Sequence, residues 1–372
     1  MDKFASVIED ADPLSSWWPF IIAFVVGLVM TIRLIMGGQR CPTSNLIDEQ
    51  VVVVTGGSGG IGLELCKALY VRSACVIMAC RNMEKAEKIA TAIKKEVGVA
   101  KAGKGCDLQV RYLDLRSFDS VRRFSRDILK DFDRIDILIN NAGIIFHPNE
   151  KTVDGFELHL QVNYLSPFLL THLLLPHLKK SPNGRIINVS AHAHVSGRIT
   201  LEDPLNIGTW ANVYHPREAF AHSKLALIMF TKYLARLLKD ETNITVNACT
   251  PGLVRGTGHL RSSPLMSALC VKAITYPWMW LFMKNPVEGA QCLIYLATDP
   301  KLQSVTGEYF NDCEIVTSSE PSNNEQLVKK LFLETVKLLK ISNFLEEKCI
   351  FLIISFSFNV RGIGNTKQRW QK

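Results

Sequence analysis

Short apolar runs alternate along the chain with longer segments whose apolar residues recur at helical spacing. Residues 51–54 are four valines, and a glycine-rich turn follows them. Apolar side chains then return every three or four positions, at Leu63, Leu65, Ala68 and Leu69. This pattern predicts a strand, a tight loop and a helix.

The same alternation continues through most of the chain. Apolar runs predict strands at residues 75–80, 109–113, 135–139 and near 307–310, and helical spacing predicts helices at residues 83–97, 117–131 and 286–296. Strands separated by helices form parallel sheets that are covered on both faces. We therefore expect an α/β fold, a doubly wound parallel sheet of about seven strands in a single domain.

A separate apolar stretch lies near the beginning of the chain. Residues 14–36 carry one internal charge, Arg33, and include Trp17 and Trp18 at one end. About 20 such residues can cross a bilayer as a helix, with the tryptophans at an interface. A cleaved signal peptide is the alternative, but the residues before the stretch are mainly acidic instead of basic. We expect an uncleaved transmembrane helix, and Arg33 with Arg40 places the rest of the chain in the cytosol.

Composition argues against several other classes of protein. The chain has 372 residues and a net charge of +8, from 43 basic and 35 acidic side chains. Half of that excess lies at the end of the chain, in Arg361, Lys367, Arg369 and Lys372. The core therefore gives no reason to expect nucleic-acid binding. The ten cysteines form no CxxC pair, so we expect reduced thiols, with neither a disulfide framework nor a metal site.

The turn after the first strand has the composition of a phosphate-binding loop. Gly56, Gly60 and Gly62 lack Cβ atoms, so the backbone can turn sharply and approach a pyrophosphate closely. The following helix would present its first amide N–H groups at the same place. A tight turn without a ligand is the alternative, but the position after a buried strand favours dinucleotide binding.

Two further positions concern the adenosine half of such a ligand. Arg81 ends the second strand, where an acidic side chain would bind the 2′-hydroxyl of NAD and arginine suits the 2′-phosphate of NADP. Asp114 follows the third strand, where it would contact the adenine ring. We expect NADP(H) to be preferred over NAD(H). A solvated arginine at a strand end is the alternative.

Four motifs then occur in a familiar order. They are TGxxxGxG at residues 55–62, Asp114, NNAG at residues 140–143, and Pro251-Gly252 after a late strand. Together they resemble the short-chain dehydrogenase/reductase (SDR) family. Segments such as DGFELHLQVNYLSPFLLTHLLLP and SKLALIMFTKYLARLL are similar to its retinol dehydrogenase-like branch.

The resemblance covers about residues 40–340 and implies a domain organisation. It predicts a membrane anchor at residues 1–36, a linker at 37–49, an SDR Rossmann domain at 50–340 and a variable hydrophobic and basic tail at 341–372. It also implies the residues that bind the cofactor. These are Thr55, Gly56, Ser58, Gly60, Ile61, Gly62, Arg81, Asp114, Leu115, Asn141, Ala142, Gly143, Lys224, Pro251 and Gly252.

The family's chemistry uses four side chains. A tyrosine exchanges the hydroxyl proton, a lysine lowers the tyrosine pKa, a serine binds the substrate oxygen, and an asparagine anchors a proton-relay water. Asn163 and Lys224 match two of these positions. The tyrosine position, four residues before Lys224, is Phe220, and the serine position is Ala191. Neither side chain can donate a proton or a hydrogen bond, so turnover is doubtful.

Three nearby side chains are candidate substitutes for the lost groups. Ser190 lies one residue early and is expected to face the opposite side of its strand, to which His192 returns. Tyr214 would need its loop to fold over the nicotinamide. His222 is on the helix of Phe220 but two positions further, so it points elsewhere.

A third departure follows Pro251-Gly252. The family's threonine that binds the nicotinamide carboxamide is Gly256 here, with Thr257 next to it. The departures from the family pattern therefore concentrate where hydride and proton would move, while the phosphate, ribose and adenine positions match.

Two functions remain open. One is an NADP-dependent oxidoreductase for a lipophilic alcohol or aldehyde of the retinoid or polyprenoid type, relying on Lys224 and Asn163 with a substitute acid. The other is a catalytically weak or inactive cofactor-binding scaffold or sensor. The apolar, aromatic residues 264–283 suit a lipid substrate or a bilayer, although packing against the sheet explains them equally well.

The resemblance also implies a cellular setting. We expect a single-pass protein of the endoplasmic reticulum or a related organelle, with the SDR domain facing the cytosol and a homodimer or a partner SDR. The apolar run at residues 349–358, followed by a basic end, suits contact with a membrane surface.

Overall fold

The structure, a computed structural model, describes residues 17–98, 107–208, 214–239, 243–256, 269–342 and 344, with the backbone alone at 269–274. Its centre is one sheet in the order β3-β2-β1-β4-β5-β6-β7-β8. The strands are β1 (Val51–Thr55), β2 (Cys75–Cys80), β3 (Leu108–Tyr112), β4 (Ile137–Asn140), β5 (Arg185–Val189), β6 (Thr245–Thr250), β7 (Tyr309–Asn311) and β8 (Glu314–Ile315). Every pair from β3 to β7 is parallel, and β8 joins β7 antiparallel.

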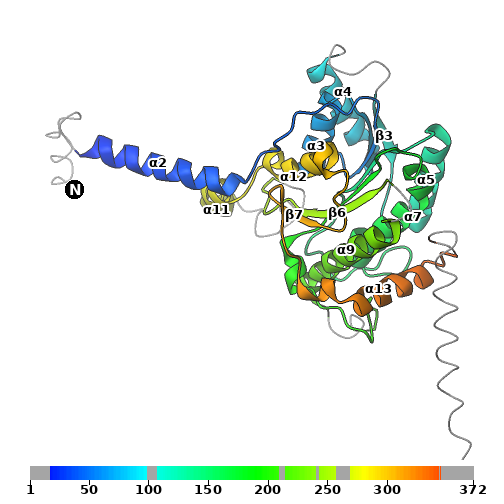
Figure 1. Cartoon of the computed structure of the whole chain (residues 1–372). Helices are drawn as coiled ribbons and strands as arrows, with labels where there is room; N and C mark the ends of the chain where they lie inside the picture. Colours follow the sequence, from blue (N-terminus) through cyan, green and yellow to red (C-terminus); the bar gives the residue numbers. More distant parts are fainter. Residues whose placement is uncertain are drawn as a thin grey trace, which may run out of the picture.

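Helices cover both faces of this sheet (Figure 1). One face carries α3 (Gly60–Val71), α4 (Met83–Val97) and α12 (Pro286–Thr298). The other face carries α5 (Phe118–Asp131), α7 (Ser166–Leu178) and α9 (Pro216–Leu238), and α13 (Glu325–Leu338) packs against α9. The predicted doubly wound α/β fold is confirmed. It has eight strands instead of about seven, because the two-residue β8 adds an antiparallel edge.

The predicted elements differ from the observed ones by a few residues at their ends. The strand expected at residues 109–113 is Leu108–Tyr112, and the one expected at 135–139 is Ile137–Asn140. The helix expected at 117–131 begins at Phe118, because Ser117 is its N-cap and accepts a hydrogen bond from the backbone N–H of Ser120.

The valines of β1 show why the sheet gives such apolar runs. Val52 and Val54 pack on the face of α3 and α4, whereas Val53 packs on the face of α5 and α7. Successive side chains of a strand point to opposite faces, and helices cover both faces here. The strand order reverses at β1, which pairs with β2 on one side and β4 on the other. Ligands of open α/β sheets bind in the crevice at the carboxyl ends of such strands.

The last described helix buries an aromatic cluster. The rings of Phe332 and Phe344 each lie 5.1 Å from that of Phe168 on α7. Phe344 is 3% exposed, so the packed core reaches past residue 340, where we expected the tail to begin. The apolar run predicted at residues 349–358 lies outside the described residues.

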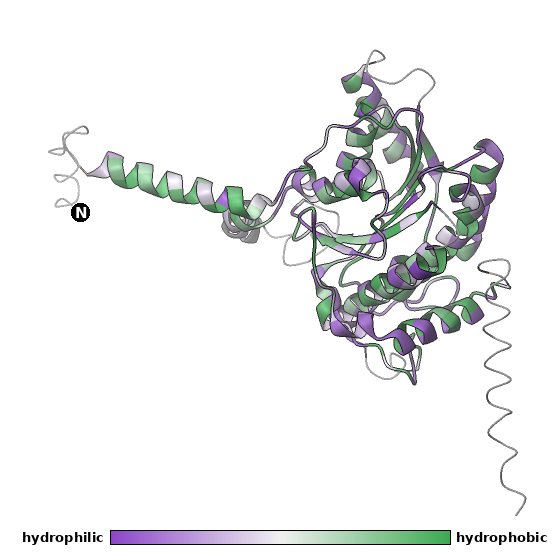
Figure 2. Ribbon diagram, in the orientation of Figure 1, coloured by the Kyte–Doolittle hydropathy of each residue, from purple (hydrophilic) through white to green (hydrophobic). Residues whose placement is uncertain are grey.

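The first described helix, α2 (Trp18–Gly37), projects from the domain and is apolar along its length (Figure 2). In the described part of the chain it is the one helix that is long and apolar enough to cross a membrane, by length and composition. Its end nearest the domain carries Arg33, which pairs with Glu288 of α12 at 2.5 Å. The helix is therefore attached to the domain by contacts as well as by the chain.

Candidate active site

A cleft of about 260 Å³ lies at the carboxyl ends of β1, β4, β5 and β6. Predicted site residues that line it are Gly56, Gly60, Ile61, Gly62, Asn141, Ala142, Gly143, Ser190, Ala191, Phe220, Lys224, Pro251 and Gly252. Those outside its lining are Thr55, Ser58, Arg81, Asp114, Leu115 and Asn163. The structure thus brings the glycine loop and the predicted catalytic positions Ala191, Phe220 and Lys224 into one cavity.

The glycines of the loop have specific steric roles. Gly56 has a φ of +71°, a conformation that side chains disfavour. A Cβ on Gly62 would lie 2.3 Å from the carbonyl oxygen of Gly56, which real Cβ atoms do not tolerate. The loop therefore closes against the start of α3 only because residue 62 is glycine.

Thr55 ties this loop to the loop after β4. Its hydroxyl accepts hydrogen bonds from the backbone N–H groups of Asn141 and Ala142, at 3.0 and 2.9 Å. The Asn141 side chain in turn donates to the Thr55 carbonyl oxygen at 2.8 Å. These bonds hold the two loops at a fixed separation along the floor of the cleft.

The beginning of α3 is suited to an anion. Its N-cap, Gly59, makes no side-chain capping bond, and the first turn carries no acidic residue. The first N–H groups of a helix need acceptors, and a phosphate can supply them in the field of the helix dipole. The geometry of this loop and helix fits the pyrophosphate of a dinucleotide.

The adenosine end is marked by residues after β2 and β3. Arg81 is exposed directly after β2, and Lys85 stands in the first turn of α4. A Cβ on Gly59 would lie 3.5 Å from the Lys85 ammonium nitrogen, so this cation reaches over the glycine loop. Asp114 is half-buried and accepts a 3.0 Å hydrogen bond from the backbone N–H of Arg116.

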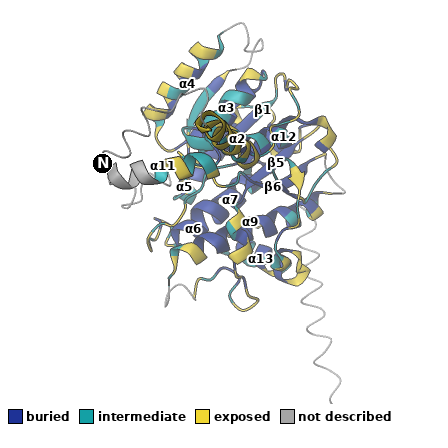
Figure 3. Cartoon of the chain, turned by 90° about the vertical axis from the view of Figure 1, so that its left-hand side faces the viewer, coloured by how far each residue is buried: buried dark blue, intermediate teal, exposed yellow. Residues whose placement is uncertain are grey.

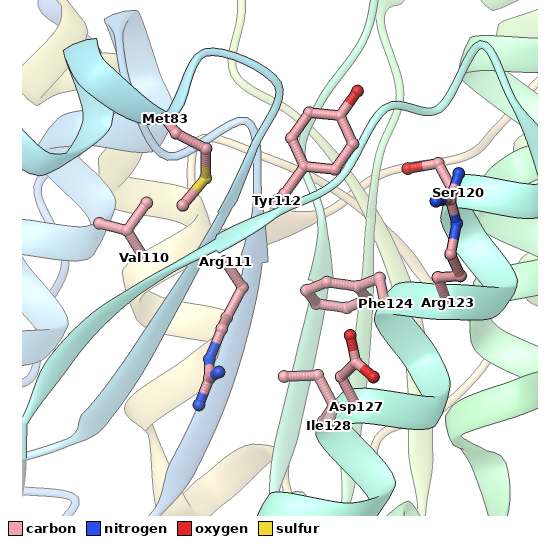
Figure 4. Close-up of a pocket in the computed structure, with 9 residues that line it drawn as sticks. All are labelled: Met83, Val110, Arg111, Tyr112, Ser120, Arg123, Phe124, Asp127 and Ile128. Atoms are coloured by element: carbon pink, nitrogen blue, oxygen red, sulfur yellow. The ribbon is translucent and has the colours of Figure 1, made fainter.

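A second hollow, of about 390 Å³, lies between the edge strand β3 and α5 (Figure 4). Two arginines in its lining are already paired, Arg111 with Asp131 and Arg123 with Asp119, each at 2.8 Å. None of its described lining residues belongs to the cleft. We assign no ligand to it.

Asn163 and Lys224 approach each other across Gly143. A Cβ on Gly143 would lie 3.1 Å from Asn163 Oδ1 and 3.2 Å from Lys224 Nζ. Asn163 is in a π-helical turn, and its amide both accepts from the Ile144 N–H and donates to the Ile144 carbonyl, at 2.9 and 3.1 Å. It also donates to the Ser223 hydroxyl at 3.0 Å. Its side chain is therefore held in one orientation behind the cleft.

Lys224 is buried on α9 and donates a 2.8 Å hydrogen bond to the Val189 carbonyl oxygen. Burial lowers the pKa of Lys224 to about 8, because the charged ammonium loses its water. At neutral pH it still carries its proton for most of the time. It can therefore present a positive charge and N–H donors to a ligand in the cleft.

Phe220 occupies the tyrosine position and is packed by aromatic rings. Its ring centre lies 5.5 Å from that of Phe146 and 6.3 Å from that of His159. The Lys224 ammonium lies 6.0 Å from the same ring. The position expected for the acid is thus an apolar wall of the cleft.

Ser190 and Ala191 follow β5 and both line the cleft. The Ser190 hydroxyl is turned away from it and donates to the Lys224 carbonyl oxygen at 2.9 Å. Ala191 has an extended backbone and no polar atom on its side chain. In the structure Ser190 therefore stabilises the contact between β5 and α9 and does not offer its proton to the cleft.

Tyr214 lies outside the cleft lining, in a polar cluster behind Phe220. Its hydroxyl donates to Glu157 at 3.0 Å, and His159 donates from Nδ1 to the same carboxylate at 2.7 Å. The His147 N–H donates to Nε2 of His159, which fixes this tautomer. Burial and the Glu157 charge raise the pKa of Tyr214 well above its usual range. Tyr214 is therefore a poor proton donor in this position.

The two histidines considered as neighbours also lie away from the reaction centre. His192 is exposed after β5. His222 is buried, donates from Nδ1 to the Arg198 carbonyl oxygen at 2.9 Å, and has its pKa lowered to about 4 by burial. It belongs to the packing of α9, as its spacing from Phe220 predicted.

The nicotinamide end is bounded by the turn after β6. Gly252 has a φ of +76°, and a Cβ there would lie 3.3 Å from the alkyl chain of Lys284. Gly256 is exposed with a φ of +73°, and no described atom would meet a Cβ there. Thr257 lies outside the described residues.

The fold and the glycine-lined cleft define a dinucleotide-binding α/β protein, and sequence comparison shows its class. A family model described as short chain dehydrogenase matches residues 50–202. Human retinol dehydrogenase 14 is 40% identical over 311 residues, which are 81% of this chain and 88% of that protein. Human retinol dehydrogenase 13 is 37% identical over 315 residues, 85% of this chain and 92% of that protein. The chain belongs to the SDR family of oxidoreductases, in its retinol dehydrogenase-like branch.

Solved structures agree on the fold. A protein of Mycobacterium paratuberculosis superposes with a TM-score of 0.63 at 29% identity, covering 82% of this chain and 98% of that one. A short chain dehydrogenase from Shigella flexneri 2a, complexed with NADP, gives a TM-score of 0.54 at 23% identity, covering 73% of this chain and 100% of that one. At this identity the second match supports the fold alone.

Sequence reasoning missed two features of the site. Lys85 was not expected near the cofactor, because Arg81 precedes α4 and Lys85 lies inside it, so no single periodicity relates the two positions. The Glu157–His159–Tyr214 cluster was also missed, because Tyr214 is 57 residues from Glu157 and no local pattern joins them.

Proposed function

We propose that this chain is a membrane-anchored SDR protein that binds NADP(H) and has lost most of its catalytic turnover. The observation that carries the proposal is the cleft itself. It joins an open glycine loop to Lys224, and it is walled by Phe220 and Ala191 where proton transfer would occur. The first half of the cleft suits binding, and the second half lacks the groups for chemistry.

The residues of the cleft fit a dinucleotide. The uncapped start of α3 suits the pyrophosphate, and Asp114 lies after β3 where the adenine would be placed. Lys224 can donate to the hydroxyls of the nicotinamide ribose. NADP(H), when bound, would supply or accept the hydride.

Two cations favour NADP(H) over NAD(H). Arg81 is exposed after β2, and Lys85 reaches over the glycine loop from the next helix. A 2′-phosphate adds charge and acceptor oxygens that arginine and lysine can bind, whereas the 2′-hydroxyl of NAD offers neither. An acidic residue at the tip of β2 would bind that hydroxyl. In the described segment 75–85 the one acidic residue is Glu84, which lies on α4 and not at the strand tip.

Turnover is expected to be low for a local reason. The Phe220 ring lies beside the rings of Phe146 and His159 and the ammonium group of Lys224, and it carries no proton donor of its own. Ser190 uses its hydroxyl on the α9 backbone. Loss of a general acid costs typically two to four decades of rate, and groups that act together cost more.

The substrate class and location follow from the relatives and from α2. The relatives are named retinol dehydrogenases, and α2 is long and apolar enough to span a bilayer. We therefore propose a lipophilic alcohol or aldehyde as the ligand of the substrate side. The anchor would hold the domain on the cytosolic side of the endoplasmic reticulum or a related membrane, as a homodimer or with a partner SDR.

Fluorescence titration and NADPH oxidation with a panel of lipophilic aldehydes test this proposal. The full chain in detergent should bind NADPH more tightly than NADH and should oxidise NADPH barely above background. Ordinary turnover would instead support an active oxidoreductase with a substitute acid. Tyr214→Phe would then identify that acid, because it removes the phenol and leaves the ring in place.

A further inference from the structure

We propose that α11 (Leu269–Phe282) is seated in the lipid headgroup region beside α2, so that the mouth of the cleft faces the membrane surface. The inference rests on the membrane anchor proposed above. In this arrangement the domain itself makes a second membrane contact, and the exposed side of α11 binds a lipid bilayer.

The first step is the position of α11 relative to α2. The two helices pack against each other: Figure 1 shows α11 at the end of α2 nearest the domain, and Figure 3, which views α2 end-on, shows α11 beside it. A helix that packs beside the end of a membrane span lies at the level of the membrane boundary. The place of α11 therefore follows from that of α2.

The second step is that this arrangement is fixed. Arg33 pairs with Glu288 at 2.5 Å, with side chains only 12% and 23% exposed, and its guanidinium lies 6.0 Å from the Trp280 ring of α11. A Cβ on Gly37 would lie 3.4 Å from a Glu288 carboxylate oxygen. The span thus ends in contact with α11 and α12. Arg33 therefore has a protein partner at this end of the helix instead of only water or lipid headgroups.

The third step is the surface that α11 leaves open. Tyr276 is 61% exposed, Trp278 62% and Phe282 41%. Trp278 and Phe282 lie one helical turn apart, and their rings stack at 5.9 Å with an interplanar angle of 5°. Tryptophan and tyrosine are the side chains that favour the interface between lipid and water. No charged residue occurs in the described side chains from 275 to 283.

The exposed surface of α11 lies next to the cleft. Lys284, two residues after the end of α11, donates a hydrogen bond from its backbone N–H to the Leu253 carbonyl oxygen at 2.8 Å. Val254 pairs with Lys284 and lines the cleft, while Leu253 beside it is 74% exposed. The end of α11 therefore forms the lip of the cleft. A lipophilic ligand could pass from the bilayer to the cleft without crossing water.

The experiment measures quenching of tryptophan emission by phosphatidylcholine that is brominated near the headgroup end of its acyl chains. The full chain is reconstituted in vesicles with and without this lipid. Trp278→Phe should lower the quenchable emission, because it removes an indole that touches lipid. Val71→Trp is the matched control: position 71 is 39% exposed at the end of α3, just before β2 begins and so at the edge of the sheet opposite the cleft, and its added emission should not be quenched.

If the fraction of tryptophan emission quenched by the brominated lipid is the same in Trp278→Phe as in the parent, the inference is wrong. Trp278 would then face water or a second copy of the chain instead of lipid. The anchor is read separately from the same samples. Quenching that remains in Trp278→Phe and falls further when Trp17 and Trp18 are also changed to Phe, together with retention in the pellet after carbonate extraction, would support α2 as the span. Release of the chain by carbonate would overturn the anchor.

Discussion

The ammonium nitrogen of Lys224 lies 6.0 Å from the centre of the Phe220 ring. If the ring carried a hydroxyl, the positive charge would ease its ionisation. A phenyl ring receives only a cation–π attraction from the same lysine. The site therefore keeps the group that tunes an acid and lacks the acid.

The closure of the glycine loop can be tested inside the loop. Gly62→Ala should lower the free energy of unfolding by about 1–3 kcal/mol and weaken NADPH binding, because its Cβ would meet the Gly56 carbonyl oxygen. Gly59→Ala is the control for folding, since its Cβ would have only the flexible end of Lys85 at 3.5 Å. Urea unfolding and NADPH titration measure both effects. Equal stability of the two variants would contradict this account of the loop.

Cofactor preference should depend on both cations at the adenosine end. Arg81→Asp should weaken NADPH binding about tenfold or more and strengthen NADH binding, because the new carboxylate can accept a hydrogen bond from the 2′-hydroxyl of NAD. Lys85→Gln should weaken NADPH binding by a similar factor and leave NADH binding nearly unchanged, since only the 2′-phosphate loses a charged partner. Lys301→Gln removes an exposed lysine after α12 and should change neither affinity. Equal affinities for the two cofactors in the unmodified protein would remove the basis of the prediction.

Lys224 should make stability depend on alkaline pH. Its pKa is about 8 in the folded chain and about 10.5 when unfolded, so the unfolded state binds more protons between these values. Stability without cofactor should therefore rise as pH increases from 8 to 10.5, by up to about 3 kcal/mol from this group. Lys224→Met should remove that rise. Parallel stability curves for the two proteins in urea unfolding would show that Lys224 is not the cause.

The aromatic cluster beneath α13 should carry part of the domain's stability. Phe332→Ala should cost about 3–5 kcal/mol, because the ring is buried against Phe168, Phe230 and Phe344. Ile315→Ala, on the exposed β8, should change the free energy of unfolding by less than about 0.5 kcal/mol. A small effect of Phe332→Ala would mean that α13 is not part of the cooperative unit.

The sequence predicted the fold because its signals are local. The valines of β1 face helices on both sides, so every position is apolar, and the glycines after them follow from one tight loop. Phe220 and Ala191 could be placed because the spacing from Lys224 and the NVSA segment identifies their positions. Their side chains then line the cleft with Lys224.

The remaining features depend on contacts between distant segments. Arg33 and Glu288 are 255 residues apart, and no periodicity in either helix indicates that they pair. The same holds for Tyr214, which bonds to Glu157 behind Phe220 instead of reaching over the cleft. Only the folded chain shows that α2 is fixed against α12 and that the Ser190 hydroxyl donates to the Lys224 carbonyl oxygen.

We propose that the site keeps the positions that bind phosphate, ribose and adenine and lacks its proton-handling groups. Phe220→Tyr would place a phenol beside Lys224, and Ala191→Ser would add a donor for the substrate oxygen. Because such groups act as a unit, their joint gain should exceed the product of the single gains. NADPH affinity should stay close to that of the parent in each variant.

The most direct measurement is the rate of NADPH oxidation with lipophilic aldehydes, for the parent, both single variants and the double variant, each saturated with NADPH. We expect a parent rate near background and a gain of about a hundredfold or more in the double variant. A parent that turns over at ordinary rates and is unaffected by Phe220→Tyr, or a double variant that binds NADPH and gains nothing, would contradict the account.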